Sequence, residues 1–264
     1  MKQLTTILLF ALCFAACQNT TESDTSTAEK TTEAAPSDEW TILFDGTSTE
    51  GWRAYNGETL PPQWIIEDDM LTFSDGAKQS DAEHEGGKDI IYAAEEFENF
   101  ELYLEWKIPE GGNSGVFYHA KEGYESPYEV APEYQMIDDE NYAKLHDLVA
   151  YNKSLGHPNP EQLQPLQQTA ADYAMYVADD EVKELNPAGE WNTTRIIFTP
   201  EQVEHWLNGK KVLSFVPWSD DWNERKNNGK WKDFPDYGKF KKGYIGLQDH
   251  DSPLWFKNIK VKKL

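Results

Sequence analysis

Hydrophobic and polar residues alternate with a period of two along much of the chain after residue 39. In the clearest case, from Phe100 to Ile108, apolar residues occupy the even positions and mostly polar residues the odd ones. This alternation predicts a strand with one buried face. Further short apolar runs predict strands at 40–44, 64–71, 116–119, 191–198, 203–215, 244–248 and 254–262. About a dozen short strands with little helix predict one all-β domain, an antiparallel sandwich or barrel.

Two polar stretches interrupt this strand pattern. Residues 139–168 spread leucines among polar residues and contain two Pro breaks, which predicts a short helical or loop insertion. Residues 217–240 are rich in Trp, Lys, Asn and Asp and form a second excursion. Between them, the Asn208-Gly209 pair predicts a tight hairpin, because both residues accept positive φ.

The segment from Glu129 to Tyr142 combines a predicted strand with several acidic and amide side chains. As a strand it would place two sets of side chains on opposite faces, Glu129, Ala131, Glu133, Gln135 and Ile137 on one and Val130, Tyr134 and Met136 on the other. The face that carries Glu133 and Gln135 suits polar chemistry, but a strand that is simply solvated on one side gives the same pattern.

The charge and the aromatic content of the chain narrow the classes of ligand and partner that it can bind. The net charge is -23, with 24 Lys and Arg against 47 Asp and Glu, which disfavours nucleic acid, anionic lipid and strongly anionic substrates. The chain has 10 Trp, 13 Tyr and 12 Phe. This excess either serves flat, partly apolar ligands such as sugar rings or reflects the preference of strands for aromatic residues.

The N-terminus resembles a bacterial lipoprotein signal. Lys2 precedes the short apolar run Leu4–Ala16, and small residues lead directly to Cys17. The resemblance implies cleavage before Cys17, lipidation of that residue and removal of Cys13. We therefore expect a signal at 1–17 and membrane attachment through lipid only, at the bacterial cell envelope (periplasmic or outer membrane).

Residues 18–38 are predicted to be a disordered tether. They consist mainly of Thr, Ser, Glu, Asp, Ala and Lys and contain no aromatic residue. Such a composition cannot bury enough apolar surface to offset the entropy lost on ordering. The folded domain is therefore expected at 39–264, and the sequence predicts no oligomeric state.

Seven motifs occur in one order: LFDG with GW, FENFELYLEWKI, GGNSGVFY, PEYQMID, PAGEWNTTRI, VEHWLNGKKV and GYIGLQDHDSPLWFKNIKVK. Together they resemble the 3-keto-disaccharide hydrolase domain family over residues 40–264. The resemblance implies a concanavalin-like jelly-roll sandwich. It also implies hydrolase or lyase action on glycosides oxidised at C3 of the sugar.

Elementary chemistry defines what such a site needs. A C3 ketone acidifies the C2 proton, so a base can form an enolate, which then expels the C1 leaving group with help from an acid. Water adds to the enone that results. The site therefore needs a base, an acid, and donors or a metal at the enolate oxygen.

Residues of the shared motifs supply the candidates for these roles. Glu133 and His250 are the proposed catalytic acid and base, in either order. The proposed substrate-binding residues are Asn113, Gln135, Asp138, Gln248, His119 and Glu105. Asn113 can equally be a turn residue, because it follows two glycines.

No cofactor is assigned from the sequence; a divalent metal that polarises the ketone, with imidazole and carboxylate as ligands, is an alternative to side-chain donors. No closely spaced histidine pair supports it, and the ligand set is left unassigned. Asp251 departs from the family, which often has Gly after the position of His250. An extra carboxylate there opposes an enolate unless a cation offsets it.

Two readings of the function differ in class. One is an enzyme acting on a 3-keto-glycoside substrate; the alternative is a non-catalytic carbohydrate-binding module on the same sandwich. A purely structural envelope protein is a third. Binding alone has little use for Glu133 and His250 in one place, so their convergence on a shared cavity favours the enzyme.

Overall fold

The computed structural model describes residues 39–74 and 88–264. The predicted signal peptide, the lipidation site Cys17 and the tether at 18–38 lie outside these residues. Within them, no helix is long and apolar enough to cross a membrane.

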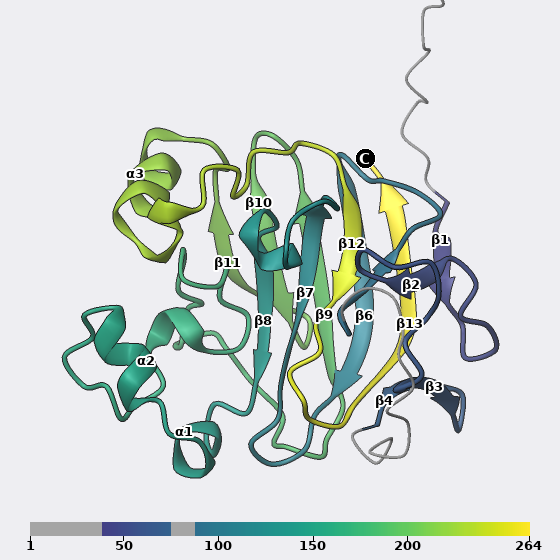
Figure 1. Cartoon of the computed structure of the whole chain (residues 1–264), viewed down its shortest axis with the longest axis horizontal. Coiled ribbons are helices and arrows are strands. Elements are labelled where there is room, and N and C mark those ends of the chain that lie inside the picture. The colour runs from purple at the N-terminus through teal and green to yellow at the C-terminus, as the bar shows by residue number, and fades with distance from the viewer. Residues whose placement is uncertain (1–38, 75–87) are drawn as a thin grey trace, which may run out of the picture. The chain divides into compact units, whose positions relative to one another are not determined.

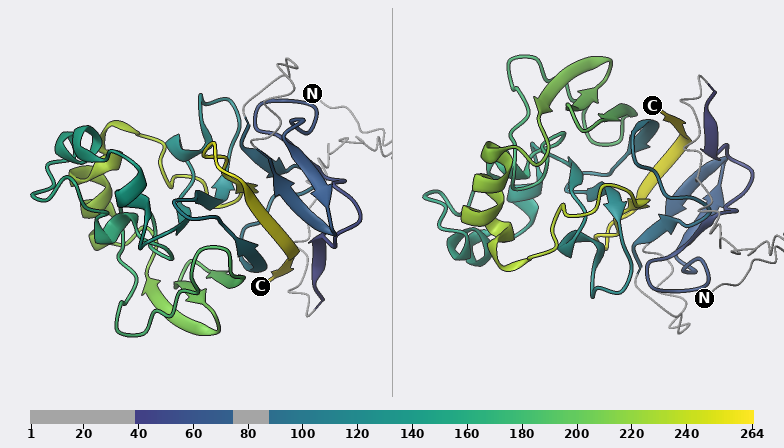
Figure 2. Two further views of the ribbon diagram at one scale, coloured as in Figure 1. Left: turned by 90° about the horizontal axis from the view of Figure 1, so that it is seen from below. Right: turned by 90° about the horizontal axis from the view of Figure 1, so that it is seen from above.

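The described residues form thirteen strands in two antiparallel sheets (Figures 1 and 2). The eight-stranded sheet has the order β11 (Lys210–Phe215), β10 (Val203–Leu207), β9 (Asn192–Phe198), β6 (Phe100–Lys107), β13 (Leu254–Lys263), β4 (Met70–Phe73) and β3 (Trp64–Glu67), with β1 (Thr41–Phe44) also paired to β13. The five-stranded sheet has the order β2 (Trp52–Ala54), β5 (Ile90–Tyr92), β12 (Tyr244–Leu247), β7 (Asn113–Ala120) and β8 (Glu133–Ile137). The predicted all-β jelly-roll sandwich is confirmed.

The period-two pattern sets the core between the sheets. In β6, buried and half-buried positions alternate along the whole strand, as its sequence predicts. Trp106 is fully buried, and its indole N–H donates to Thr194 Oγ1 of β9 at 2.9 Å. The predicted hairpin between β10 and β11 is also present, with φ of 48° at Asn208 and 80° at Gly209.

The two excursions contain the helices. The first holds α1 (Tyr142–Leu145), α2 (Val149–Ser154) and a 3₁₀ turn at Pro165–Gln167. The second holds α3 (Asp220–Asn228), which begins where Ser219 Oγ accepts from Trp222 N, and a 3₁₀ turn at Lys230–Asp233. Figures 1 and 2 show these helices on the side of the sandwich away from β1.

Strand β8 is shorter than its sequence suggests. It begins at Glu133, and Pro127–Glu129 form a 3₁₀ turn instead of extended chain. Pro127 suits the first position of such a turn, and Ser126 N donates to Glu129 Oε1 at 3.1 Å. The prediction that Glu129 shares the strand face of Glu133 is therefore wrong.

Both edges of β8 carry hydrogen bonds. One edge pairs with β7 over Glu133–Ile137. Along the other edge, Tyr173 N donates to the Glu133 carbonyl at 2.9 Å, and Gln135 N donates to the Ala171 carbonyl at 3.1 Å. Because the strand is held on both sides, its side chains keep fixed positions on the sheet.

Candidate functional site

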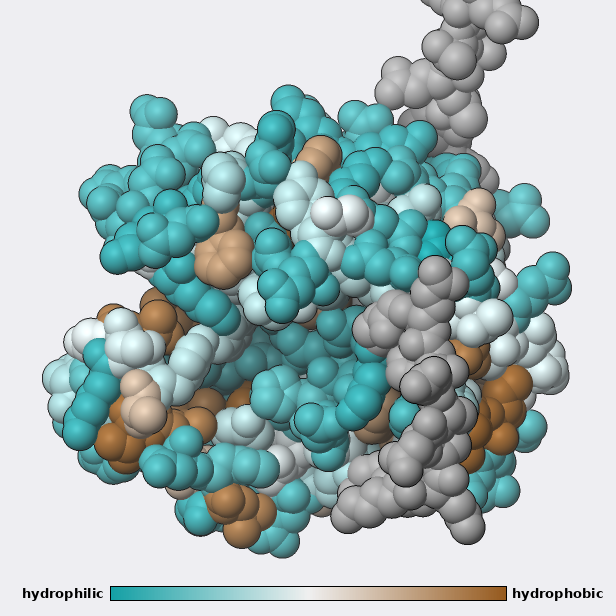
Figure 3. All heavy atoms as spheres, in the orientation of Figure 1, coloured by the Kyte–Doolittle hydropathy of each residue, from teal (hydrophilic) through white to brown (hydrophobic). Residues whose placement is uncertain are grey.

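A cavity of about 620 Å³ lies over the outer face of the five-stranded sheet. The strands β7 and β8, the turn after β12 and both excursions contribute to its lining. Figure 3 shows the face of the protein that is hollowed near its centre, over mainly hydrophilic residues. Five residues proposed from the sequence line this cavity: Asn113, Glu133, Gln135, Gln248 and His250.

Glu133 lies on the cavity floor and is only 3% exposed. Its side chain crosses Gly115 of β7, where an added Cβ would meet Glu133 Oε1 at 2.1 Å. Oε1 is buried and has no hydrogen-bond partner. Burial raises the pKa of Glu133 to about 8; nearby Lys230 opposes this rise, and Asp89 and Asp172 add to it. The carboxyl is therefore mostly protonated at neutral pH.

Two amide side chains flank this carboxyl on the same face. Asn113 pairs with Ile137 across the strands, and its buried Oδ1 has no partner. Gln135 accepts from Met136 N through Oε1 at 2.9 Å, which leaves its NH₂ group as the part it can offer to a ligand. Both amides are suited to hydrogen bonds with sugar hydroxyls.

The turn after β12 brings His250 to the same cavity. Gln248 N donates to the Gly115 carbonyl at 2.9 Å, and Ser114 Oγ donates to the Gln248 carbonyl at 2.8 Å. These bonds hold the turn against β7. The cavity walls lower the pKa of His250 below its usual value by withdrawing part of the ring from water, although the residue stays exposed on one side.

Asp251 follows His250 with φ of 56°, a left-handed conformation that glycine adopts most easily. Glycine, which the resemblance implies at this point, would adopt this conformation without strain, and Asp is among the residues that tolerate such a φ. Lys88 Nζ lies 2.6 Å from Asp251 Oδ1. This cation offsets the carboxylate that the sequence places beside the site.

The structure adds residues that the sequence analysis missed. Asp89, Tyr151, Tyr173, Lys230 and Asp249 also line the cavity. Burial, with the charge of Asp249, raises the pKa of Asp89 to about 7, although a backbone N–H opposes the rise. Asp249, next to His250, was within reach of sequence reasoning, whereas Lys230 lies in an excursion with no strand periodicity and gave no local signal.

Aromatic side chains form part of the cavity wall. They are Tyr128, Tyr142, Tyr151, Tyr173 and Phe234. None of the ten tryptophans, all within the described ranges, lines this cavity, and five of them are buried elsewhere. The sugar-stacking surfaces available in the cavity are therefore Tyr and Phe rings.

Asp138 lies outside this cavity and acts on the chain itself. Its carboxylate accepts from Gly111 N at 2.8 Å and from the backbone N–H groups of Glu140 and Asn141, each at 3.2 Å. These bonds hold the turn that leads into Asn113. Asp138 therefore positions a cavity residue and is not itself available to a ligand there.

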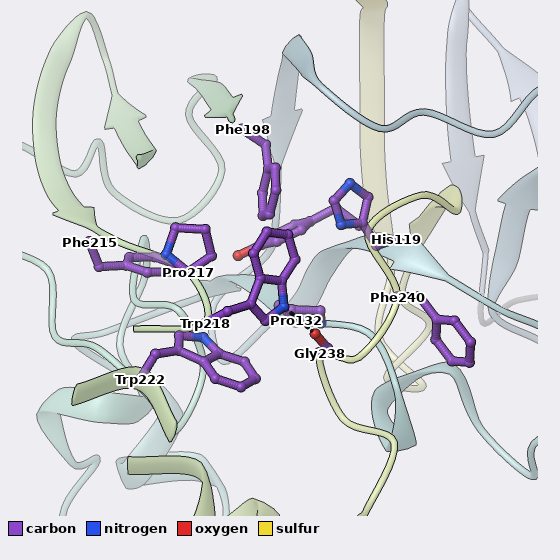
Figure 4. Close-up of a pocket in the computed structure, with 10 residues that line it drawn as sticks. His119, Pro132, Phe198, Phe215, Pro217, Trp218, Trp222, Gly238 and Phe240 are labelled. Carbon is purple, nitrogen blue, oxygen red and sulfur yellow. Dashed lines mark hydrogen bonds between the residues drawn. The ribbon is translucent and has the colours of Figure 1, made fainter. Parts of the chain in front are cut away.

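His119 also lies outside this cavity. It has φ of 56°, and the pairing of β7 with β12 shifts register there. This bulge turns the ring into the core, where it lies 4.3 Å from the Phe198 ring and its Nε2 donates to the Glu98 carbonyl at 2.8 Å. Figure 4 shows it among aromatic side chains. The void that these side chains line has a volume of about 10 Å³, which is too small for a sugar. Burial lowers the pKa of His119 to about 4.

Glu105 belongs to the other sheet. It lies on β6, half-buried, and accepts from Asn258 Nδ2 at 2.7 Å, with Lys257 Nζ at 3.4 Å. It takes no part in lining the cavity. Of the eight residues proposed as catalytic or substrate-binding, the structure thus brings five together and places Asp138, His119 and Glu105 elsewhere.

The divalent metal that the sequence left as an alternative has no evident set of ligands. In the ranges 39–74 and 88–264, no three His, Cys, Asp or Glu side chains form a group that could hold a metal ion. The cavity residues described above are thus side-chain donors and acceptors, and a metal stays an alternative to them.

Comparisons with known proteins identify relatives over most of the chain. A family model described as "3-keto-alpha-glucoside-1,2-lyase-like domain" matches residues 39–262. A 3-keto-disaccharide hydrolase of Bacteroides thetaiotaomicron is 34% identical over 247 residues, which cover 86% of this chain and 79% of the relative.

Two solved structures of proteins from Parabacteroides distasonis, both proposed to be glycosyl hydrolases, agree with this. One has a TM-score of 0.73 at 39% identity, covering 85% of this chain and 94% of its own. The other has a TM-score of 0.58 at 26% identity, covering 86% and 100%. The prediction of an enzyme of the glycosidase type is confirmed. The chain belongs to the 3-keto-alpha-glucoside-1,2-lyase-like domain family.

Proposed function

We propose that this protein cleaves glycosides whose sugar carries a C3 ketone, by elimination across C1 and C2 followed by addition of water. The observation that carries the proposal is that Glu133 and His250 line one cavity, in surroundings that shift their pKa values in opposite directions. At neutral pH the Glu133 carboxyl holds its proton and the His250 imidazole is neutral. A pair of groups pushed apart in this way suits one acid and one base.

This difference supports one order of the two roles that the sequence left open. Neutral His250 is the base that removes the C2 proton, and protonated Glu133 is the acid that serves the leaving oxygen. The electrons of the C2–H bond move into a C2=C3 double bond, and the C3 oxygen becomes an enolate.

The second step expels the leaving group. The enolate re-forms the C3 carbonyl, a C1=C2 double bond forms, and the C1–O bond breaks. The leaving oxygen takes the proton of Glu133 and departs as an alcohol. At this point His250 is an imidazolium and Glu133 is a carboxylate.

Hydration reverses these roles and restores the enzyme. Glu133 takes a proton from water, whose oxygen adds to C1, and His250 returns a proton to C2. The products are the 3-keto sugar and the free alcohol. Asn113, Gln135 and Gln248 hold the remaining sugar hydroxyls, and the Tyr rings contact the apolar ring face.

The test is product analysis of the purified full chain with a 3-keto-glucoside and with its parent glucoside, each with and without EDTA. We expect release of the alcohol from the ketone only, and loss of release in Glu133→Gln and His250→Ala. Loss of alcohol release on EDTA treatment would show that the reaction needs a metal. A folded protein that binds the ketone but releases no alcohol would contradict the enzyme and support a carbohydrate-binding module.

The pH dependence of kcat/KM provides a second test of the proposed roles. kcat/KM should fall on the alkaline side near pH 8, the pKa of Glu133, because the acid loses its proton there. It should fall on the acid side below the usual histidine range, because His250 then becomes protonated. A profile that keeps rising through pH 8 would contradict this assignment of roles.

A further inference from the structure

Lys230 is the only Lys or Arg among the described residues that line the cavity. It is half-buried, and no carboxylate of the described residues lies within ion-pair distance of its ammonium. The carboxyl groups of Glu133, Asp89 and Asp249 line the same cavity without forming an ion pair with it. A half-buried cation without a direct partner is costly, which indicates a role for it.

Aromatic rings surround this ammonium. Its Nζ lies 4.2 Å from the centre of the Tyr173 ring, 4.4 Å from that of Trp231 and 5.6 Å from that of Tyr151. The ring faces stabilise the positive charge by cation–π attraction. Unlike a carboxylate, they do not occupy the three N–H donors in strong hydrogen bonds, so these donors stay available for an oxygen in the cavity.

The neighbouring Trp231 fixes the position of Lys230. It is 1% exposed and stacks on Tyr237 at 4.2 Å between ring centres. Its indole N–H donates to the Tyr173 carbonyl at 3.2 Å, next to the strand that carries Glu133. The 3₁₀ turn that begins at Lys230 is therefore anchored in the core, and its first side chain is directed at the cavity.

Lys230 also lies within electrostatic reach of both proposed catalytic groups. Its positive charge lowers the pKa of both Glu133 and His250. In the proposed reaction C1 and C2 of the sugar lie between these two groups, which places the C3 oxygen in the cavity that Lys230 lines. The surrounding carboxyl groups disfavour a substrate that is already anionic, whereas an oxygen that gains charge only during the reaction fits a single cation.

We propose that Lys230 is a third catalytic residue, whose ammonium donates to the C3 ketone oxygen and stabilises the enolate that forms there. This inference rests on the proposed function. The ammonium donates hydrogen bonds only; it forms no covalent bond to the substrate.

A 3-keto sugar with hydrogen in place of the C1 leaving group isolates this step. With 1,5-anhydro-3-ketoglucitol in D₂O, the full chain can form the enolate but has no exocyclic C1 group to expel, and NMR follows exchange of the C2 proton. We expect Lys230→Met to slow exchange by about 10²–10³-fold, the usual effect of removing one oxyanion donor. Lys230→Arg should retain part of the rate.

One variant serves as a matched control. Lys232→Met removes an exposed lysine of the same turn and should exchange as the unsubstituted chain does. Thermal melting of all variants separates a lost donor from a lost fold.

The outcomes separate this inference from the function on which it rests. Exchange by Lys230→Met at the unsubstituted rate would overturn the role of Lys230 and leave the elimination intact. An unsubstituted chain that releases alcohol without exchanging C2 would overturn the elimination, and the role of Lys230 with it. A mass gain on Lys230 after borohydride treatment with the ketone would overturn the hydrogen-bonding role in favour of an iminium.

Discussion

Glu105 and Glu133 lie on the outer faces of the two sheets, each at a polar position of its strand, but their environments differ. Glu105 on β6 is half-buried and bonded to Asn258, Tyr103 and Lys257. Glu133 on β8 is buried under the excursions, and its Oε1 has no partner. A buried acceptor without a partner costs about 1–3 kcal/mol. The protein thus satisfies the glutamate that stabilises a sheet and leaves unsatisfied the one that we propose to be catalytic.

This difference indicates where chemistry can occur. A carboxyl that is fully bonded by its own protein has nothing left for a ligand. A carboxyl that is held in place by packing, with a raised pKa and an open hydrogen-bonding position, can exchange a proton with one. The predictions below test this contrast.

The largest effect is expected from the two glutamates themselves. Glu133→Gln should lower kcat/KM by about 10²–10⁴-fold, the usual contribution of a general acid. Glu105→Gln should leave kcat/KM unchanged. A 4-nitrophenyl 3-ketoglucoside, whose leaving group needs no proton, should restore much of the rate of Glu133→Gln. Equal losses with both leaving groups would contradict the role of Glu133 as acid.

The two histidines give a second contrast. His250→Asn should lower kcat by about 10²-fold or more, because it removes the base. His119→Asn keeps a residue that tolerates a positive φ but loses the bond to the Glu98 carbonyl, so it should lower the free energy of unfolding by about 1–3 kcal/mol with kcat retained at low temperature. Urea denaturation and initial rates check both. A catalytic defect in a folded His119→Asn would be unexpected.

Asp138 should act on stability. Asp138→Ala leaves three backbone N–H groups without their acceptor and should lower the free energy of unfolding by about 1–3 kcal/mol. Glu140→Ala, an exposed neighbour, should change it by less than about 0.5 kcal/mol. KM should rise in Asp138→Ala as well, because the turn that holds Asn113 loosens.

The raised pKa of Glu133 predicts a pH dependence of stability with a definite sign. Between its ordinary value of 4.5 and about 8, the folded protein holds a proton that the unfolded chain has released. The free energy of unfolding therefore falls as pH rises through this window, by at most about 1.4 kcal/mol per pH unit. Glu133→Gln lacks this term, so it should gain stability relative to the unsubstituted chain from about pH 5 to about pH 8. A constant difference across that range would show that the pKa is not raised.

The smallest effect is expected at Asp251. Asp251→Gly loses an exposed ion pair with Lys88 but relieves a left-handed backbone, so stability should change by less than about 1 kcal/mol. Asp251 raises the pKa of His250, so its loss should move the acid limb of the kcat/KM profile to lower pH. An unmoved limb would place the carboxylate out of reach of the imidazole.

Much of the fold followed from local pattern. Period-two burial predicts β6 correctly, and Asn208-Gly209 predicts the hairpin, because both depend on residues close in sequence. The shared face of Glu133 and Gln135 was predictable for the same reason.

The rest of the site depends on contacts that periodicity does not report. A bulge turns His119 into the core, against the alternation of its strand. Lys230 reaches the cavity through a turn anchored by Trp231, about which the local sequence says nothing. Asp138 directly follows β8, yet its carboxylate accepts hydrogen bonds from the neighbouring backbone and does not face the cavity.

The elimination is tested most directly by the hydrogen at C2 of the product. The full chain is given a 3-keto-glucoside in D₂O, and the 3-keto sugar released at early times is examined by NMR, beside the free 3-keto sugar incubated alone. The account predicts deuterium at C2 of the released sugar well above that control, because the C2 proton passes to His250, whose exposed ring exchanges it with D₂O before a proton returns to C2. A released sugar that keeps its C2 proton, together with an unchanged rate of alcohol release from the C2-deuterated substrate, would show direct displacement at C1 and contradict the account.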